Sequence, residues 1–260
     1  MAKAAMILVF DEKSALEEYL VGKWMETARG AVSERGLFAA ALSGGRTPAG
    51  FFRRLALVKD ATLWRDTHIF MVDERIVPHD DKDSNWAMMK AVLFENVPIP
   101  RGNIHPVPTD CRSGTCAVRY ENDLKAFFRP RTAEGGTPVF DLVHLGLGGD
   151  GHTASLFPGA AALKEKRRLT AAVPDEKRHD RVTLTYPVLN SARNIVFLVT
   201  GEDKAGILER VIGGDPSLPA SGINPQKGGR LLILADRAAA SRLKTGAYAL
   251  NPALSRGERE

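Results

Sequence analysis

The chain has 260 residues, of which 44% are hydrophobic and 26% are charged, and its formal net charge is +5. This length suffices for a sizeable buried core, and the composition excludes a disordered or fibrous chain. No apolar run approaches the ~20 residues that a membrane helix needs. We therefore expect a globular protein without a membrane partner, folded as one domain over residues 1–260.

Strand-like and helix-like patterns alternate along the first half of the chain. An apolar run at 6–10 predicts the first strand, and Asp11 can cap the helix that follows. In that helix apolar residues recur at helical spacing, at Leu16, Tyr19, Leu20, Trp24 and Ala28. Further patterns predict strands at 37–42 and 68–72, and helices from about Pro48, at 84–94 and at 118–128.

The second half continues the alternation. Apolar runs predict strands at 140–147, 182–184, 195–199 and 231–235, with one more helix at 201–212. Strands so continuously apolar favour a parallel sheet covered on both faces. We interpret the Pro- and Gly-rich stretches at 97–114, 130–139 and 213–230 as surface connections, and the polar residues from 251 onward as a frayed end.

The excess positive charge admits an anionic partner, but its distribution does not favour nucleic acid. The densest basic run, Lys164–Arg168, is interrupted by Glu165 and has no interleaved aromatic residues. We interpret it as a solvated surface and expect no nucleic-acid partner. The apolar run at 6–10 is followed at once by acidic residues, which is not the pattern of a signal peptide, so we expect a cytoplasmic protein.

The two cysteines, Cys111 and Cys116, do not form a metal motif. Their C-x4-C spacing lacks a second pair that would complete a zinc site. They lie in a polar, loop-like stretch. In a cytoplasmic protein we expect them to be reduced free thiols, the alternative being a disulfide.

The most informative segment follows the apolar run 140–147. Glycines at 148, 149 and 151 end that run and deliver Asp150 and His152, two residues apart. Open α/β sheets bind their ligands at the carboxyl ends of such strands, and glycine lets the backbone approach a ligand closely. This predicts a functional role for both side chains; the alternative is a tight turn with a solvated acid and histidine.

A second candidate lies after the strand predicted at 37–42. Ser43, Gly44, Gly45, Arg46 and Thr47 form a short loop that opens a helix at position 48, where a proline is well suited and Thr47 can act as the cap. Backbone N–H groups in a glycine-rich loop can point at an anion, and an arginine adds a full charge. The loop predicts a phosphate cradle, with an ordinary strand-to-helix turn as the alternative.

Asp73, Glu74 and Arg75 follow the strand predicted at 68–72. Three charged residues at the end of a buried strand are costly unless they are paired or used. Arg75 suits a phosphate, and the acids suit sugar hydroxyls or a proton; the alternative is a salt-bridge cluster or a helix cap. Downstream, Ser84 predicts a capped helix start, and Asn85 can reach a ligand.

The strand predicted at 195–199 leads to Lys204, in the first turn of a helix. Acids are expected there, so a lysine fits better with an anion nearby, the alternative being a solvated lysine. His144 lies inside an apolar strand and is interpreted as a satisfied core residue. The remaining histidines are interpreted as surface residues: His68, His79, His105 and His179. Together the four strand ends predict a site for a phosphorylated polar metabolite, with acid–base chemistry on a carbonyl or an ester.

These motifs resemble the 6-phosphogluconolactonase family, in its order and over nearly the whole chain. The matching segments are SGG with TP at 43–48, DER at 73–75, SN at 84–85, GLGGDGHTASLFP at 146–158, RVTLT at 181–185, and TG at 200–201 with Lys204. The related glucosamine-6-phosphate deaminase and isomerase family usually continues into Asn-Glu-Pro where this chain has Leu156-Phe157-Pro158, which favours the lactonase. Arg46 is a departure, because the lactonase family commonly has serine there.

The resemblance implies a doubly wound, Rossmann-like α/β fold with a mostly parallel sheet and helices on both faces. It also implies a cytosolic role in the oxidative pentose phosphate route, hydrolysis of a phosphorylated sugar lactone, and no metal or organic cofactor. His152 would activate water, with Asp150 orienting it and Asp73 assisting. The phosphate and the sugar would be held by residues of the four strand ends: Ser43, Gly44, Gly45, Arg46, Thr47, Glu74, Arg75, Asn85, Gly149, Arg181 and Lys204.

Two other functions stay open. One is an aldose–ketose isomerase with deaminase activity, in which Asp73 would remove a carbon-bound proton. The other is a sugar-phosphate sensor that binds without turnover. We expect a monomer or a weak homo-oligomer.

Overall fold

The computed structural model describes residues 5–131, 136–175, 178–226, 228–244, 246 and 248–250. In these residues one sheet has eight strands in the order β11-β1-β10-β9-β6-β2-β3-β5, and every neighbouring pair is parallel. The strands are β1 (Met6–Phe10), β2 (Phe38–Leu42), β3 (Thr67–Met71), β5 (Ile104–His105), β6 (Leu142–Gly146), β9 (Asn194–Val199), β10 (Arg230–Asp236) and β11 (Ala249–Leu250).

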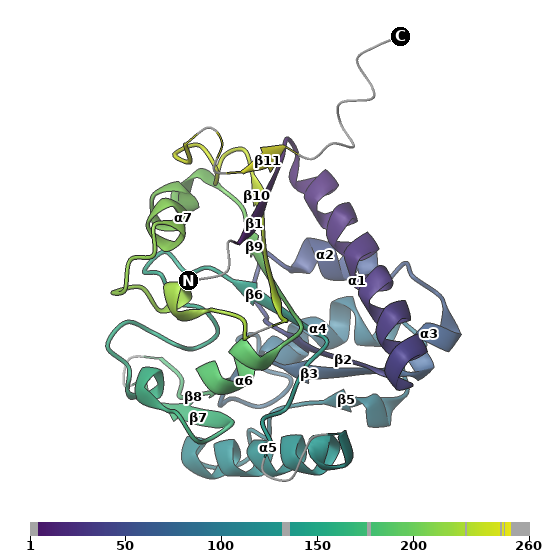
Figure 1. Ribbon diagram of the computed structural model, residues 1–260. Coiled ribbons are helices and arrows are strands. Elements are labelled where there is room, and N and C mark those ends of the chain that lie inside the picture. The colour runs from purple at the N-terminus through teal and green to yellow at the C-terminus, as the bar shows by residue number, and fades with distance from the viewer. Residues whose placement is uncertain are drawn as a thin grey trace.

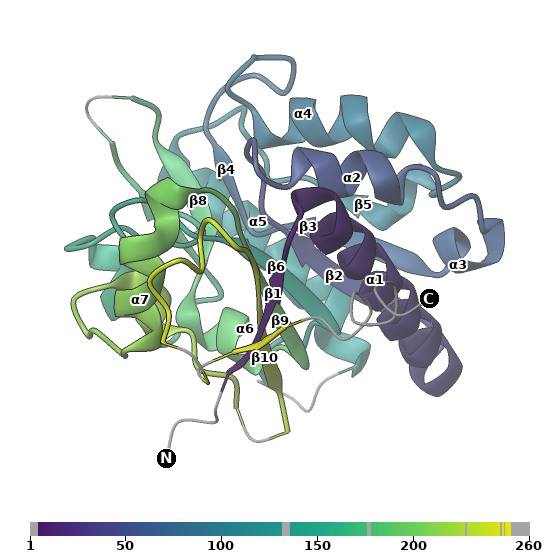
Figure 2. The ribbon, with the colours of Figure 1, turned by 90° about the horizontal axis from the view of Figure 1, so that it is seen from above.

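Helices cover both faces of this sheet (Figure 1). Seen from above, α1 and α2 lie on one side and α6 and α7 on the other (Figure 2). The predicted doubly wound α/β fold with a parallel sheet is thus confirmed. The helices are α1 (Lys13–Arg35), α2 (Ala49–Leu55), α3 (Ala61–Arg65), α4 (Asn85–Val92), α5 (Ser113–Phe128), α6 (Tyr186–Ser191) and α7 (Ala205–Ile212).

A second, smaller sheet is antiparallel, in the order β4-β8-β7. It consists of β4 (Asp73–Arg75), β7 (Thr170–Val173) and β8 (Arg181–Leu184). Val72 joins it to the main sheet, because its N–H donates to the carbonyl of Leu42 (2.9 Å) and its carbonyl accepts from the N–H of Leu184 (2.8 Å). The sequence predicted only β8, since three charged residues and a short Thr-Ala-Ala-Val run do not show a strand pattern.

The apolar patterns locate the core correctly. All five residues of β2 are buried, and three of them are alanines, so helices can approach both faces closely. In α1 the buried residues include Leu16, Leu20, Trp24 and Ala28, at the predicted spacing. The cap of this helix was predicted wrongly. Glu12 occupies the N-cap without a side-chain hydrogen bond, and Asp11 instead pairs with Arg237.

Several connections are more ordered than predicted. Helix α5 begins at 113 rather than 118, and β5 lies within the expected loop 97–114. In the expected loop 213–230, Leu218, Ala220 and Ile223 are buried. The helix expected at 201–212 begins as a 3₁₀ turn (Glu202–Lys204) before α7. The expected frayed end lies outside the described residues. Along the described part of the chain, no helix has both the length and the apolarity to cross a membrane.

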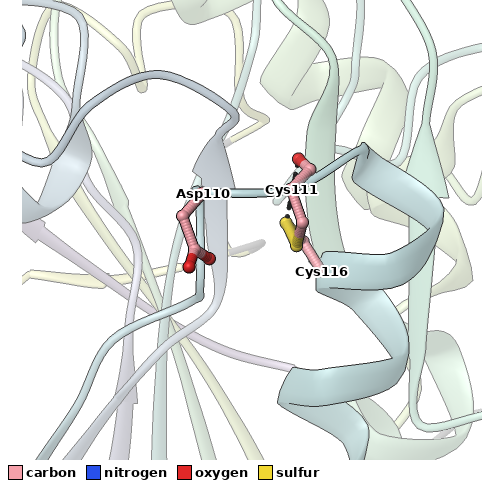
Figure 3. Close-up of side chains that lie close together, drawn as sticks. All are labelled: Asp110, Cys111 and Cys116. Atoms are coloured by element: carbon pink, nitrogen blue, oxygen red, sulfur yellow. Dashed lines mark hydrogen bonds between the residues drawn. A yellow bond between two sulfur atoms is a disulfide. The ribbon is translucent and has the colours of Figure 1, made fainter.

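Cys111 and Cys116 form a disulfide, so the prediction of free thiols was wrong. Cys116 lies in the first turn of α5, and the preceding residues fold back toward it, so the two Cα atoms are 5.7 Å apart, within the usual range for a disulfide. Figure 3 shows Asp110 beside them. Asp110 and the two cysteines are close enough to suggest a metal site, but the sulfurs are bonded to each other, and Asp110 pairs with Arg119 at 2.5 Å.

His68, His79 and His105 are not simple surface residues. The Nδ1 atom of His68 lies 3.1 Å from the Nε2 atom of His105, whose ring stacks on Phe70 with ring centroids 3.9 Å apart. The Nε2 atom of His79 bonds to the carbonyl of Val107 at 2.9 Å. These contacts connect segments distant in sequence, which no local pattern indicates. His179 is likewise half-buried, and its Nε2 atom lies 3.2 Å from the Oδ2 atom of Asp83.

His144 is buried in β6, as predicted, but it is not satisfied. Its ring lies 5.8 Å from the ring of Phe51 and 6.1 Å from that of Phe52, between centroids. Within the described residues neither ring nitrogen has a hydrogen-bond partner. This burial disfavours the charged form and lowers the pKa of His144 to about 4.

The buried His144 should make stability depend on pH. Its pKa is depressed in the folded state, so between about pH 4 and 6.5 the unfolded chain binds a proton that the folded chain does not. The free energy of unfolding should therefore rise with pH across this window. On going from pH 7.5 to pH 5, the wild type should lose about 2 kcal/mol more than a His144→Phe variant. Urea unfolding at both pH values measures this; equal losses would contradict it.

Candidate active site

A cleft of about 190 Å³ opens where β2 and β6 end and where the small sheet begins. It brings together most of the predicted site residues. Glu74, Gly149, Asp150 and Lys204 do not line it. The lining residues are Ser43, Gly44, Gly45, Arg46, Thr47, Pro48, Asp73, Arg75, Asn85, Gly146, Leu147, Gly148, His152, Ala154 and Arg181.

The imidazole of His152 faces this cleft and is held from behind by Asp150. The Oδ1 atom of Asp150 lies 2.5 Å from the ring Nδ1 and also accepts the backbone N–H of His152 at 3.1 Å. Partial burial raises the pKa of the Asp150 carboxyl, but the hydrogen bonds and charge of His152 outweigh it, and the pKa is lowered overall. With Nδ1 donating to the carboxylate, Nε2 keeps its lone pair.

Two glycines make this arrangement possible. A Cβ atom at Gly148 would lie 2.1 Å from the Nδ1 atom of His152, so only glycine leaves room for the ring. Gly151 has a φ of +82°, and its N–H donates to the carbonyl of Gly148 at 3.0 Å. The N–H of Gly148 donates to the carbonyl of His152 at 2.8 Å. These two N–H groups therefore close the turn and do not point toward a ligand.

The turn after His152 connects it to the small sheet. Ala154 has a φ of +53°, and Thr153 and Leu156 bridge across it. As a result Ser155 is fully buried, and its Oγ donates to the Oδ2 atom of Asp73 at 2.7 Å. Sequence reasoning missed Ser155. Its type fits an ordinary turn residue, and its partner is 82 positions away along the chain.

Two arginines face each other at the other side of the cleft. In the β4–β8 register Arg75 is opposite Arg181, which places both side chains on the same face. Arg75 Nη1 donates to the carbonyl of Asp83 at 2.6 Å, and the Arg181 guanidinium lies 5.3 Å above the ring of Phe157. Both Nε atoms are buried and have no partner among the described residues. Burial lowers the pKa of Arg181; the charge of nearby Asp73 acts against this effect, and the charge of Arg75 adds to it. Such a pair is suited to hold an anion.

The glycine-rich loop 43–47 forms the floor of the cleft. The N–H of Ser43 donates to the carbonyl of His144 at 3.2 Å, and its Oγ is buried without a partner among the described residues. A Cβ atom at Gly44 would lie 2.2 Å from Asn85 Oδ1, so glycine allows the loop and α4 to touch. Pro48, not Thr47, is the N-cap of α2, and no side chain caps this helix. The predicted Thr47 cap was therefore wrong.

Glu74 is a helix cap. Its fully buried carboxylate accepts the backbone N–H groups of Arg75 (2.8 Å), Asn85 (2.8 Å) and Trp86 (2.7 Å) and the hydroxyl of Ser84 (3.1 Å). Burial raises its pKa, although the three N–H groups act against this. The alternative interpretation, a cap, thus describes Glu74 better than ligand binding. Ser84 caps α4 as predicted, by accepting the N–H of residue 87.

Lys204 lies beside the glycine-rich loop that carries Asp150 and His152 rather than along the cleft. Its Nζ atom would be 3.8 Å from a Cβ atom at Gly149 and lies 3.3 Å from Asp203 Oδ2. Asn85 does reach the cleft, where its Nδ2 donates to the carbonyl of Asp73 at 3.0 Å. A larger, open hollow of about 650 Å³ lies elsewhere, lined partly by Arg119 and Asp110, but those charges are already paired with each other. The smaller cleft is therefore the candidate active site.

Comparison with known proteins identifies one family. The family model described as glucosamine-6-phosphate isomerases/6-phosphogluconolactonase matches residues 11–233. A 6-phosphogluconolactonase of Synechocystis is 42% identical over 218 residues, which cover 82% of this chain and 88% of that one. A 6-phosphogluconolactonase of Nostoc is 40% identical over 217 residues, with the same shares of both chains.

Solved structures agree with this result. A 6-phosphogluconolactonase from Trypanosoma brucei has a TM-score of 0.79 at 30% identity and covers 94% of this chain and 100% of its own. A monomeric glucosamine-6-phosphate deaminase has a TM-score of 0.72 at 19% identity over 91% of this chain and 99% of its own, which is a likeness of fold alone. On the family match and the identity to its curated relatives, the chain belongs to the glucosamine-6-phosphate isomerase/6-phosphogluconolactonase family.

Proposed function

We propose that this protein is a 6-phosphogluconolactonase, which hydrolyses 6-phospho-D-glucono-1,5-lactone to 6-phospho-D-gluconate in the cleft described above. Relatives of that name are 40–42% identical over most of the chain. One observation carries the assignment of the site: an imidazole backed by a carboxylate shares a single cleft with two facing arginines whose Nε groups are unpaired.

The arginine pair binds the phosphate of the substrate. Like charges directly opposite on an antiparallel pair destabilise it, and a phosphate dianion between Arg75 and Arg181 would remove that repulsion. Their planar guanidinium groups suit phosphate oxygens. Arg46 lines the same cleft and adds a third positive charge from the loop 43–47. Binding at this remote group positions the lactone ring for attack.

His152 acts as the general base. Nε2 takes a proton from water as the water oxygen attacks the lactone carbonyl, and Asp150 stabilises the imidazolium that forms. The tetrahedral intermediate then collapses with cleavage of the ring C–O bond. The imidazolium returns its proton to the departing ring oxygen, so the product carries a new carboxylic acid, which ionises, and a free hydroxyl. Asp73 and Asn85, which also line the cleft, contact sugar hydroxyls.

The structure gives a reason to prefer the lactonase over the deaminase. The segment 156–158, where the two families differ in sequence, lies at the site. Phe157 packs its ring 4.5 Å from that of His152 and beneath the guanidinium of Arg181. An apolar ring there supports both the proposed base and the phosphate site. Assays of lactone opening and of ammonia release from glucosamine 6-phosphate decide between the two; ammonia release without lactone opening would refute the assignment.

Replacing His152 with Asn should remove the base and leave the phosphate site in place. We expect kcat to fall by about 10²–10⁴-fold while KM changes little, because general-base catalysis contributes a factor of that size. Steady-state assays of lactone hydrolysis measure both constants. His79→Asn, outside the cleft, is the matched control and should keep wild-type kinetics. A near-normal kcat in the His152→Asn variant would show that another group activates the water.

Replacing Arg75 or Arg181 with Ala should chiefly raise KM, because each change removes one of the two guanidinium groups proposed to bind the phosphate. We expect an increase of about tenfold or more for each variant, in line with a lost charge-assisted hydrogen bond. Arg210→Ala is the matched control, since Arg210 pairs with Asp215 away from the cleft. An unchanged KM in both site variants would place the phosphate elsewhere.

A further inference from the structure

Ser155 contacts the cleft through Asp73. It has no role in the proposed hydrolysis of the lactone. Its side chain is fully buried, which is unusual for a serine that forms no part of a strand or helix. Its Oγ donates to Asp73 Oδ2 at 2.7 Å, and its N–H donates to Thr183 Oγ1 at 3.2 Å. Thr183 is the register partner of Asp73 in the β4–β8 pair. Ser155 is therefore held against the strand pair that carries both arginines.

Among the residues of β4 and β8, Asp73 is the one acidic side chain on the face that carries Arg75 and Arg181. It is two residues before Arg75 on β4, so the two side chains point to the same face. Arg181 is its diagonal neighbour on β8, at a separation that long side chains can span. All three line the cleft. An ion pair between Asp73 and either arginine is thus within reach.

That ion pair is nevertheless not formed. Among the described residues, no carboxylate oxygen of Asp73 lies within the 4.0 Å of an arginine nitrogen that defines an ion pair, and both arginine Nε atoms stay unpartnered. The hydroxyl of Ser155 holds one carboxylate oxygen, and the N–H of Ser155 is itself fixed by Thr183. A hydrogen bond to a carboxylate is charge-assisted and therefore among the stronger ones.

We propose that Ser155 is a positioning residue that keeps the Asp73 carboxylate away from Arg75 and Arg181, so that their charge stays available to the substrate phosphate. This rests on the proposed function of the arginine pair. Without the hydroxyl, Asp73 gains by turning toward a half-buried guanidinium, because a buried charge is costly unless it is paired. The carboxylate then competes with the phosphate for the same guanidinium groups.

Calorimetric binding of 6-phosphogluconate, the unreactive product, tests this with three variants. Ser155→Ala should weaken binding about tenfold, a coupling within the range for contacting groups. Asp73→Asn should leave the affinity for inorganic phosphate equal or higher, because it removes the competing charge and no contact that inorganic phosphate makes. For 6-phosphogluconate the same variant also loses the proposed contact of Asp73 with a sugar hydroxyl, so the effect of Ser155→Ala is compared within each Asp73 background. The double variant should bind like Asp73→Asn alone. Rescue by Asp73→Asn separates positioning from a general structural role, because a merely damaged fold would not recover when a second site residue is changed.

Inorganic phosphate as a second probe separates this proposal from the lactonase assignment, because its binding needs no lactone chemistry. Ser221→Ala is the matched control; its hydroxyl is buried and has no partner among the described residues, so binding should not change. Weaker phosphate binding in Ser155→Ala that disappears in the Asp73→Asn background supports the proposal whether or not the wild type opens lactones. Unchanged binding in Ser155→Ala, or an equal loss in both backgrounds, overturns it.

Discussion

Two guanidinium groups of like charge face each other across one antiparallel strand pair, and the rest of the site is arranged around that repulsion. In the β4–β8 register Arg75 is opposite Arg181, so the backbone keeps the two side chains on one face. Burial adds to the difficulty, since it disfavours the charged form of Arg181. A bound dianion would offset this repulsion, in keeping with the proposed phosphate site.

The scaffold holds this strand pair firmly. Val72 bonds at once to the main sheet and to β8, and the hydroxyl of Tyr120 on α5 both donates to the carbonyl of Met71 (2.7 Å) and accepts its N–H (2.9 Å). Glu74 then fixes the start of α4 to the middle of β4. Each contact uses a buried polar group that is fully paired, and together they limit the freedom of the charged side chains beside them.

On the histidine side of the cleft, glycines determine where the imidazole can lie. Gly148 leaves space for the ring of His152, and Gly151 adopts a positive φ. Asp150 orients the ring, and Phe157 packs beside it. The turn through Ala154 joins this loop to the strand pair at Ser155. The proposed base and the arginine pair proposed to bind the phosphate are therefore connected through one short turn. A few short-range contacts set the distance between them.

The sequence by itself determined the parts of this protein that depend on neighbours along the chain. The parallel strands, the spacing of α1 and the loop that delivers Asp150 and His152 all follow from apolar runs and glycines a few residues apart. Only the tertiary structure decided that Glu74 is a cap and that Cys111 and Cys116 are bonded. The same holds for the face-to-face arginines and for Ser155 on Asp73. Strand register and the folding back of a loop set these contacts, and a buried polar residue looks the same in sequence whatever its distant partner is.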